Sequence, residues 1–163
     1  MRGLIAFIAA SFAMLRADPA DALVCQLIGG CSCTVSATDM AFGNVTPGVE
    51  AGATADVSIH CTGLAELFPS IGAKIGPGAH GALAARKMQS AGGAQLTYNI
   101  YDAPASSTIL GEGAGGYPML TLSGGILGLG QWQVTGHLYG RMTPPLDAQA
   151  GAYSDTVTVR IDW

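Results

Sequence analysis

The chain has 163 residues, which suits a single domain, and it contains 24 glycines but only 11% charged residues. This composition is too apolar for a disordered chain and too rich in glycine for a helical bundle. The net charge of −4 offers no basic field for nucleic acid or anionic lipid, and we interpret the Arg86-Lys87 pair as a solvated strand end.

The first segment, residues 1–22, has the layout of a secretory signal peptide. A basic residue near the start is followed by an uncharged, mostly apolar stretch from Gly3 to Leu15, and Ala20-Asp21-Ala22 offers a cleavage site between small residues. The apolar stretch is too short to span a bilayer, so we expect no membrane insertion once the segment is removed. A buried N-terminal helix is the alternative, and cleavage after Ala17 is a second possible position.

Residues 23–32 form a short extension before the predicted domain, residues 33–163. The four cysteines lie on both sides of this boundary, at Cys25, Cys31, Cys33 and Cys61. An even number of cysteines in an exported chain predicts disulfides. Zinc is the competing interpretation, but the chain has no CxxC pair, and His60 beside Cys61 is not a usual ligand spacing. We therefore expect neither a metal nor a cofactor.

Short segments in which apolar and polar residues alternate predict β-strands along the rest of the chain. In Ala55–Cys61 the apolar residues alternate with polar ones such as Asp56 and His60, which gives one buried face. Similar patterns predict strands at Thr34–Ala37, Ile71–Ile75, Leu96–Ile100, Met119–Leu122, Trp132–Leu138 and Val157–Trp163. Leu83–Met88 fits a helical turn or a strand equally well, and Gly111–Gly130 is otherwise a predicted long loop. Short strands at this spacing indicate an all-β sandwich.

The sequence does not support a catalytic constellation. The histidines His60, His80 and His137 are far apart, and two of them fall on the polar faces of predicted strands, where a solvated histidine is the ordinary expectation. There is no G-x-S-x-G elbow or other nucleophile motif. We therefore predict that the protein has no catalytic residue.

Two other groups of side chains leave a second interpretation open. The acids Asp102, Glu112 and Asp155 could pair as glycosidase carboxylates, although acids at turns and strand ends are far more common. The aromatic residues Tyr139, Tyr153 and Trp163 could form a surface for sugar stacking, although packing in the sandwich core is the more common role. A small secreted enzyme is therefore a remote alternative.

Eight short motifs, read in order, resemble the spore coat protein U domain family. They are Cys33-Thr34-Val35, Ala41-Phe42-Gly43-Asn44-Val45-Thr46-Pro47, Val57-Ser58-Ile59-His60-Cys61, Arg86-Lys87-Met88, Leu96-Thr97-Tyr98-Asn99-Ile100-Tyr101, Gly111-Glu112-Gly113, Leu138-Tyr139-Gly140-Arg141-Met142 and Gly151-Ala152-Tyr153-Ser154-Asp155-Thr156-Val157. Each motif alone is weak, but eight in the right order and spacing are specific. There are two departures, because Leu110 stands where the family usually has Trp, and because Cys25 and Cys31 are additional.

The resemblance implies an immunoglobulin-like β-sandwich that lacks one strand, in a pilus subunit assembled by an archaic chaperone–usher system. A missing strand leaves an open sheet edge and an exposed apolar groove. A periplasmic chaperone would fill the groove first, and the N-terminal segment of a neighbouring pilus subunit would replace it at the outer-membrane usher. The candidate groove residues are Val157, Val159, Ile161 and Trp163, with an ordinary core strand as the other interpretation. We expect a secreted protein that crosses the periplasm to the cell surface and supports adhesion or biofilm formation. The alternative is a tip adhesin that binds surfaces or glycans.

The family pattern also places a disulfide between Cys33 and Cys61, with Cys31–Cys61 as the competing link. If Cys33 bonds Cys61, then Cys25 and Cys31 remain to bond each other. An extended strand between those two would span roughly 20 Å, whereas a disulfide holds its Cα atoms within about 7 Å. The bridged extension must then fold into a loop and cannot serve as a donor strand, which favours a tip or terminal subunit. The apolar alternation of Leu23–Leu27 argues for a donor strand instead.

Overall fold

The computed structural model describes residues 8–17, 32–64, 71–122 and 129–162, and every regular element within these ranges is a β-strand. In chain order the strands are β1 (Ile8–Ala17), β2 (Ser32–Ala37), β3 (Gly43–Val45), β4 (Ala51–Leu64), β5 (Ile71–Ile75), β6 (Arg86–Ser90), β7 (Gln95–Tyr101), β8 (Leu120–Leu122), β9 (Leu129–Met142) and β10 (Tyr153–Asp162). The predicted all-β class is confirmed. The ambiguous segment at residues 83–88 resolves into a turn that leads into the strand β6.

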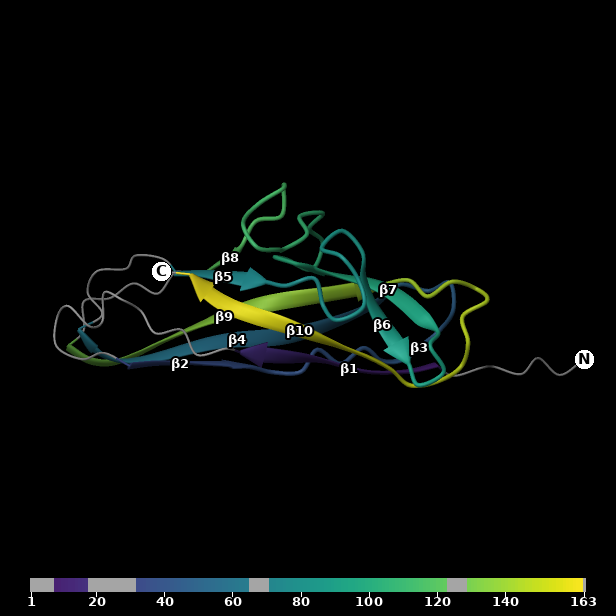
Figure 1. Cartoon of the computed structure of the whole chain (residues 1–163), viewed down its shortest axis with the longest axis horizontal. Coiled ribbons are helices and arrows are strands. Elements are labelled where there is room, and N and C mark those ends of the chain that lie inside the picture. The colour runs from purple at the N-terminus through teal and green to yellow at the C-terminus, as the bar shows by residue number, and fades with distance from the viewer. Residues whose placement is uncertain (1–7, 18–31, 65–70, 123–128, 163) are drawn as a thin grey trace, which may run out of the picture.

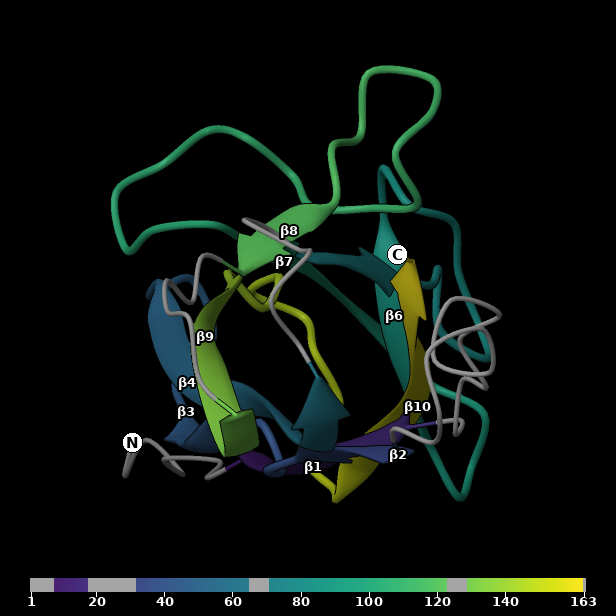
Figure 2. The same ribbon diagram turned by 90° about the vertical axis from the view of Figure 1, so that its left-hand side faces the viewer.

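The strands form one sheet in the order β2-β4-β9-β7-β6-β10-β1-β3, with β5 paired to both β10 and β8. Neighbouring strands are antiparallel except for β1, which runs parallel to β10. The end-on view in Figure 2 shows that the sheet curves around a shared interior, with β4 and β9 on one side and β10 and β6 on the other. Two facing halves of one antiparallel sheet fit an immunoglobulin-like β-sandwich.

The two longest strands, β4 and β9, form the central ladder of the sheet. They pair along their full fourteen residues, from Ala51 opposite Met142 to Leu64 opposite Leu129, with no shift in register. Both run along the long axis of the molecule in Figure 1. The alternation seen in the sequence decides which face is buried, because Val57 and Ile59 have no exposed surface while His60 faces solvent.

The core lies between the two halves of the sheet and is apolar apart from two charged residues. Its members come from most of the strands and from the segment before β3, and the largest fully buried apolar side chains are Tyr98, Tyr153, Met40, Ile59, Ile75, Met88, Leu96, Ile100, Leu110 and Leu138. The two charged residues in the core are Arg86 and Asp155. Charge is rarely buried without partners, so these two residues indicate a paired polar site inside the core.

A glycine in β9 allows the segment before β3 to pack closely on the central ladder. A Cβ atom at Gly140 would collide with the side chains of Met40 and Phe42, both of which are buried. Phe42 also meets Tyr98 edge-on, with ring centroids 6.0 Å apart. The motif Leu138-Tyr139-Gly140 therefore needs its glycine for packing.

The structure differs from the sequence predictions at the starts of two strands and at the N-terminus. β4 begins at Ala51, four residues before the predicted start, and β9 begins at Leu129, so the predicted loop over Gly111–Gly130 ends earlier. Ile8–Ala17 forms β1, which the sequence did not predict, and the alternative of an N-terminal helix is wrong for those residues. An apolar run without a clear period fits either element, and here its pairing partners decide the outcome.

Candidate functional site

β10 carries three of the four predicted groove residues, and all three lie in the core. Val157 and Val159 have no exposed surface and Ile161 is almost fully buried, whereas Trp163 lies outside the described residues. On one side β10 pairs with β6 near its start and with β5 near its end. The other side of β10 pairs with β1.

β1 lies between β10 and β3 and joins these two strands into one sheet. Its residues run parallel to β10 from Ala10 opposite Tyr153 to Ala17 opposite Val159, with a register shift between Ala10 and Ala13. On its other side β1 pairs antiparallel with β3, from Ile8 opposite Val45 to Ala10 opposite Gly43. Within the described residues, β3 has no other strand partner. The backbone groups of β10 and β3 that face each other are therefore satisfied by a segment from residues 1–22.

Three sequence motifs that are far apart along the chain meet in a buried polar cluster of Arg86, Tyr98 and Asp155. The Tyr98 hydroxyl donates to Asp155 Oδ2 at 2.8 Å. Arg86, which is fully buried, donates from Nε to the Gly76 carbonyl at 2.9 Å and from Nη2 to the carbonyls of Ile75 at 3.0 Å and Leu110 at 2.9 Å. The cluster links β6, β7 and β10 to the end of β5 and to the segment around Leu110.

Asp155 is the member of this cluster that belongs to β10. Its Oδ1 accepts from the backbone N–H groups of Ala79 at 2.8 Å and Thr156 at 2.9 Å. The loop after β5 approaches so closely that a Cβ atom at Gly78 would collide with the Asp155 carboxylate, and Gly78 has a φ of 85°. Glycine is required there for both reasons. One carboxylate thereby fixes β10 to two other parts of the fold.

The cluster shifts the proton affinities of two of its members. Burial raises the pKa of the Tyr98 hydroxyl well above its ordinary value, and the charge and hydrogen bond of Asp155 raise it further. Burial also lowers the pKa of the Arg86 guanidinium, against the opposing effects of Tyr98 and Asp155. Tyr98 is therefore held as a neutral hydrogen-bond donor.

Two of the four cysteines lie within the described backbone. Cys33 of β2 is directly opposite Cys61 of β4 in an antiparallel pair. Opposed residues in such a pair have Cα atoms about 4.5–5.5 Å apart, a separation that suits a disulfide. Cys25 and Cys31, the predicted second pair, lie outside the described residues.

The side chains considered for catalysis occupy separate places. His60 and His80 are exposed, and so are Asp102 and Glu112, whereas Asp155 is buried in the cluster described above. Among the described residues no group of three or more His, Cys, Asp or Glu side chains could hold a metal ion. No helix within the described ranges is long and apolar enough to cross a membrane.

The aromatic residues considered for sugar stacking are also separated. Tyr153 is buried, and its hydroxyl donates to the Gln149 carbonyl at 2.7 Å, so it packs in the core as the commoner role predicts. Tyr139 is half-buried on the outer face of β9, opposite Tyr101 of β7. Trp163 lies outside the described residues. Tyr139 lines a surface depression.

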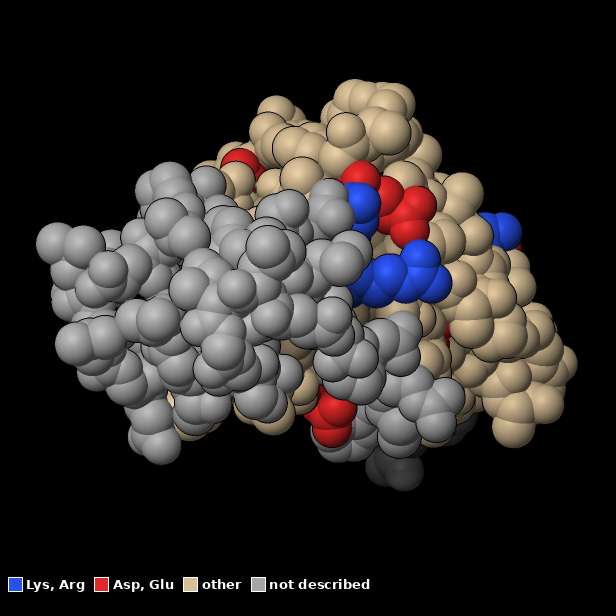
Figure 3. Space-filling model, turned by 60° about the vertical axis from the view of Figure 1, so that its left-hand side comes forward, with Lys and Arg blue, Asp and Glu red and all other residues tan. Residues whose placement is uncertain are grey.

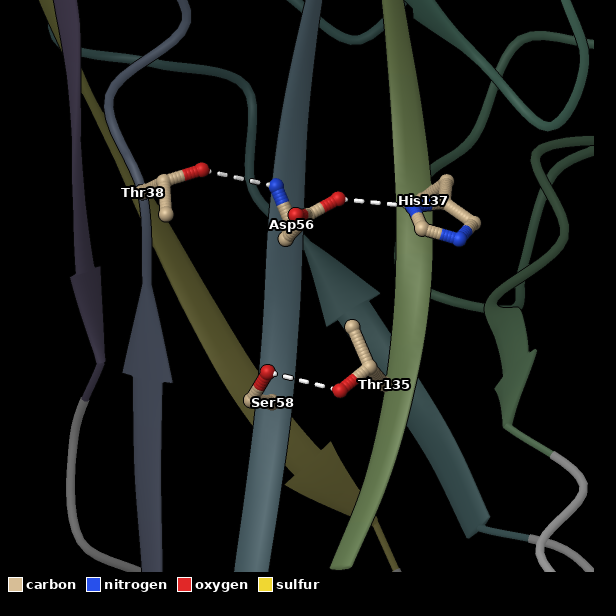
Figure 4. Close-up of polar contacts among 5 residues, drawn as sticks. All are labelled: Thr38, Asp56, Ser58, Thr135 and His137. Carbon is tan, nitrogen blue, oxygen red and sulfur yellow. Dashed lines mark hydrogen bonds and ion pairs between the residues drawn. The ribbon is translucent and has the colours of Figure 1, made fainter.

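The outer face of the central ladder is lined with paired polar side chains (Figure 4). His137 Nδ1 lies 2.6 Å from Asp56 Oδ1, and the hydroxyls of Ser58 and Thr135 are 2.9 Å apart. The hydroxyl of Thr38 accepts from the backbone N–H of Asp56 at 2.8 Å. These pairs cross between neighbouring strands, which is the usual arrangement on the solvent side of a sheet.

Charge is sparse on the surface. In Figure 3 several basic and acidic side chains lie side by side near the centre, a few others stand apart, and most of the other described atoms in this view are uncharged. A shallow depression beside β5 and β10 has a similar mixture, because Lys74, Glu112 and Arg160 all line it. Neither sign forms a broad field on the face shown.

The sequence reasoning missed two of these features, and the signals available for them differ. The cluster of Arg86, Tyr98 and Asp155 could have been suspected from the sequence. Each member lies inside one of the eight motifs, at a position where the strand alternation predicts a buried apolar residue. The role of Ile8–Ala17 as a strand had no such signal, because the same residues fit a signal peptide.

Comparison with known proteins agrees with the family resemblance. No curated protein matches the chain. The Spore Coat Protein U domain matches it over residues 22–160, which covers β2 to β10 almost completely and includes the cluster of Arg86, Tyr98 and Asp155. The chain therefore belongs to the Spore Coat Protein U domain family.

Proposed function

We propose that the protein is a structural subunit of a secreted pilus or surface coat, assembled by donor-strand complementation through a chaperone–usher system. The family is one of structural surface and pilus subunits and not of enzymes. The observation that supports the specific proposal is the origin of β1. The strand between β10 and β3 comes from Ile8–Ala17, which the sequence assigns to a signal peptide.

Removal of residues 1–22 on export would leave that position in the sheet open. The facing edges of β10 and β3 would then expose unpaired N–H and C=O groups above a core that includes Val157 and Val159. Open edges of this kind pair readily with another chain. A periplasmic chaperone would supply the strand during transit, and a neighbouring subunit would supply it after the outer-membrane usher, as β-strand addition.

The cysteines bear on the position of the subunit within the assembly. In this proposal Cys33 bonds Cys61 across β2 and β4, as the backbone register allows. Cys25 then bonds Cys31, the extension of residues 23–32 closes into a loop, and the subunit receives a strand but does not donate one. Peptide mapping under non-reducing conditions distinguishes this pattern from Cys31–Cys61. A terminal position also suits a role in adhesion or biofilm formation.

The test is the capture of the exported chain, residues 23–163, by the periplasmic chaperone of the same organism. We expect a soluble one-to-one complex with the chaperone and self-association without it, measured by size-exclusion chromatography with light scattering. Val157→Asp should abolish capture because it places a charge beneath the open edge, whereas Thr156→Asp, on the exposed face of the same strand, should not. Removal of Thr158–Trp163 should also abolish it. A stable monomer that needs no chaperone and binds no hydrophobic dye would contradict the proposal.

A tip adhesin that binds glycans is the second candidate, and one observation favours it. Tyr139 and Arg141 line a depression on the outer face of the sheet, and they belong to β9, which does not pair with β1. An adhesin needs such a binding surface in addition to a groove for strand exchange.

A further inference from the structure

We propose that the outer face of β4, β9 and β7 contains a binding site for a neutral, hydroxyl-rich carbohydrate. The site extends the second candidate function to a place and a ligand class, and it does not require strand exchange. It lies where two depressions meet, with volumes of about 310 and 520 Å³. Glu50 and Arg141 line both depressions, so the two form one continuous feature of a size that suits a small ligand.

The site is built on paired strands, which hold its side chains in fixed rows. In one row Arg141 of β9 lies between Gly52 of β4 and Asn99 of β7. In the next row Tyr139 lies between Thr54 and Tyr101. Positions on the strands of a sheet are more precise than positions on loops.

Arg141 is fixed by two contacts but keeps one donor unpaired. Its Nη2 donates to the carbonyl of Ser106, and its guanidinium carbon lies 3.8 Å from the centroid of the Tyr101 ring, a cation–π contact. Its Nε is buried and finds no hydrogen-bond acceptor among the described residues. An unpaired buried donor costs about 1–3 kcal/mol.

Asn99, the direct cross-strand neighbour of Arg141, has an unpaired acceptor where Arg141 has an unpaired donor. Its Nδ2 donates to the Ala84 carbonyl at 2.7 Å, which fixes the orientation of the amide. Its Oδ1 is then an acceptor, and it too is buried without a partner in the part of the chain that the structure describes. Within the described ranges three buried side-chain atoms lack a partner in this way; the third, on Arg86, is in the core, whereas these two are on neighbouring residues.

A hydroxyl combines the acceptor and the donor that these two atoms lack. A hydroxyl can accept from Arg141 Nε and donate to Asn99 Oδ1, whereas a carboxylate can only accept and an ammonium can only donate. Both atoms are shielded from solvent, so the side chain of Arg141 must move to admit a hydroxyl, and the two new hydrogen bonds favour that movement.

The charged and aromatic residues around the two atoms indicate which kind of hydroxyl-bearing ligand would bind. The carboxylates of Asp39 and Glu50 can accept from further hydroxyls, and together with Arg141 they leave an excess of one negative charge, which disfavours an acidic sugar. The half-buried ring of Tyr139 adds an aromatic surface of the kind that packs against sugar rings. A neutral sugar matches this combination.

Gly52 provides a way to block the site without disturbing the sheet. A Cβ atom there would meet nothing closer than the Gly140 carbonyl oxygen at 3.8 Å, an ordinary contact. Valine also suits a strand position, so Gly52→Val should fold normally while it fills the space beside Arg141.

The test is binding of cellobiose, maltose and N,N′-diacetylchitobiose to the full chain, measured by saturation-transfer NMR and calorimetry, with glucuronic acid as the acidic comparison. We expect at least one neutral sugar to bind with a Kd of about 1 mM, and Gly52→Val to weaken it about tenfold or more. Arg141→Lys, which keeps the charge but lacks Nε, and Asn99→Leu should each weaken binding about fivefold or more. Thr135→Val, on the same outer face but outside the two depressions, should leave binding unchanged.

A second readout uses the unaltered protein. The bound sugar should shift the NMR signals of the Asn99 amide and the Arg141 Nε–H. The inference is wrong if none of the neutral sugars binds, if glucuronic acid binds better than they do, or if Gly52→Val binds the sugar as well as the original chain. Because the measurements use the full chain, they are independent of whether the exported form exchanges strands.

Discussion

The two sides of the sandwich differ in how their strands are held together. On one side β4 and β9 pair over fourteen residues without a shift in register, and both come from the matched domain. On the other side β10 and β3 are joined by β1, which pairs with only three residues of β3, shifts register along β10 and comes from residues before the matched domain. One side is built from the domain itself, and the other includes a strand from outside it.

The difference indicates that the two sides of one small domain can open at different cost. A long unbroken ladder with a buried face resists opening, whereas an interrupted ladder opens at lower cost. The side of β10 that β1 covers is therefore the part of the sheet where one strand could be exchanged for another while the β4–β9 ladder stays intact.

Removal of residues 1–22 is the strongest test of the difference between the two sides of the sandwich. We expect the free energy of unfolding to fall by about 4–5 kcal/mol, more than a typical single substitution but less than the whole stability of a small domain, because β10 and β3 both lose their shared partner. Hydrogen exchange should show opened amides in β10 and β3 and slow exchange in β4 and β9. A synthetic peptide of Ile8–Ala17 should restore protection, and a scrambled peptide of equal composition should not. Equal stability with and without residues 1–22 would contradict the comparison.

An intermediate effect is expected when the buried cluster loses one hydrogen bond. Tyr98→Phe removes the donor to Asp155 Oδ2 and should lower the free energy of unfolding at pH 7 by about 1–3 kcal/mol, measured in urea. Tyr139→Phe, whose ring is half-buried on the outer face, is the matched control and should change it much less. Similar losses for the two variants would show that the hydrogen bond between Tyr98 and Asp155 contributes no extra free energy of unfolding.

The free energy of unfolding of Tyr98→Phe should also depend on pH differently from that of the original chain. The pKa of Tyr98 is raised in the folded protein, so its stabilising effect is complete below the pKa of the unfolded chain, about 10, and declines as pH rises above it. The original chain should therefore lose stability faster than Tyr98→Phe between about pH 9.5 and 11. Parallel curves for the two proteins over that interval would exclude a contribution from Tyr98.

The smallest effect is expected on the outer face of the β4–β9 ladder. Asp56→Asn removes the charged partner of His137, but the two side chains are 47% and 62% exposed, so the loss should be below about 1 kcal/mol at pH 6. Added salt should reduce the difference further, because exposed ion pairs are screened. A loss of several kcal/mol would mean that this ladder depends on side-chain pairs and not on its backbone and core.

The fold could be predicted from the sequence wherever a strand has one buried and one exposed face. Alternation such as that of Val57, Ser58 and Ile59 is a local property, and the structure confirms the strands it predicts. The start of β4 at Ala51 was missed because small residues there carry little periodicity. The pairing of β1 with β10 depends on contacts distant in sequence, which a local pattern does not contain.

The candidate sites divide in the same way. The burial of Val157 and Val159 follows from their parity, so they could be chosen from the sequence alone. The cluster could at most be suspected from the same alternation, because Arg86 looks like half of a solvated basic pair until the fold places the carbonyls of residues 75, 76 and 110 around it. The neighbouring defects of Asn99 and Arg141 likewise depend on side-chain geometry that a sequence does not contain.

Asp155 has a consequence for the uniformity of a fibre. If β10 slid by one residue, the Asp155 carboxylate would move to the outer face and lose the two donors that come from outside β10, Tyr98 and Ala79. The loss of these hydrogen bonds disfavours any other register, so each copy of the chain presents the same residues of β10 to the strand that lies beside it. A filament built from such copies would have a constant axial repeat, set within each subunit by a single carboxylate.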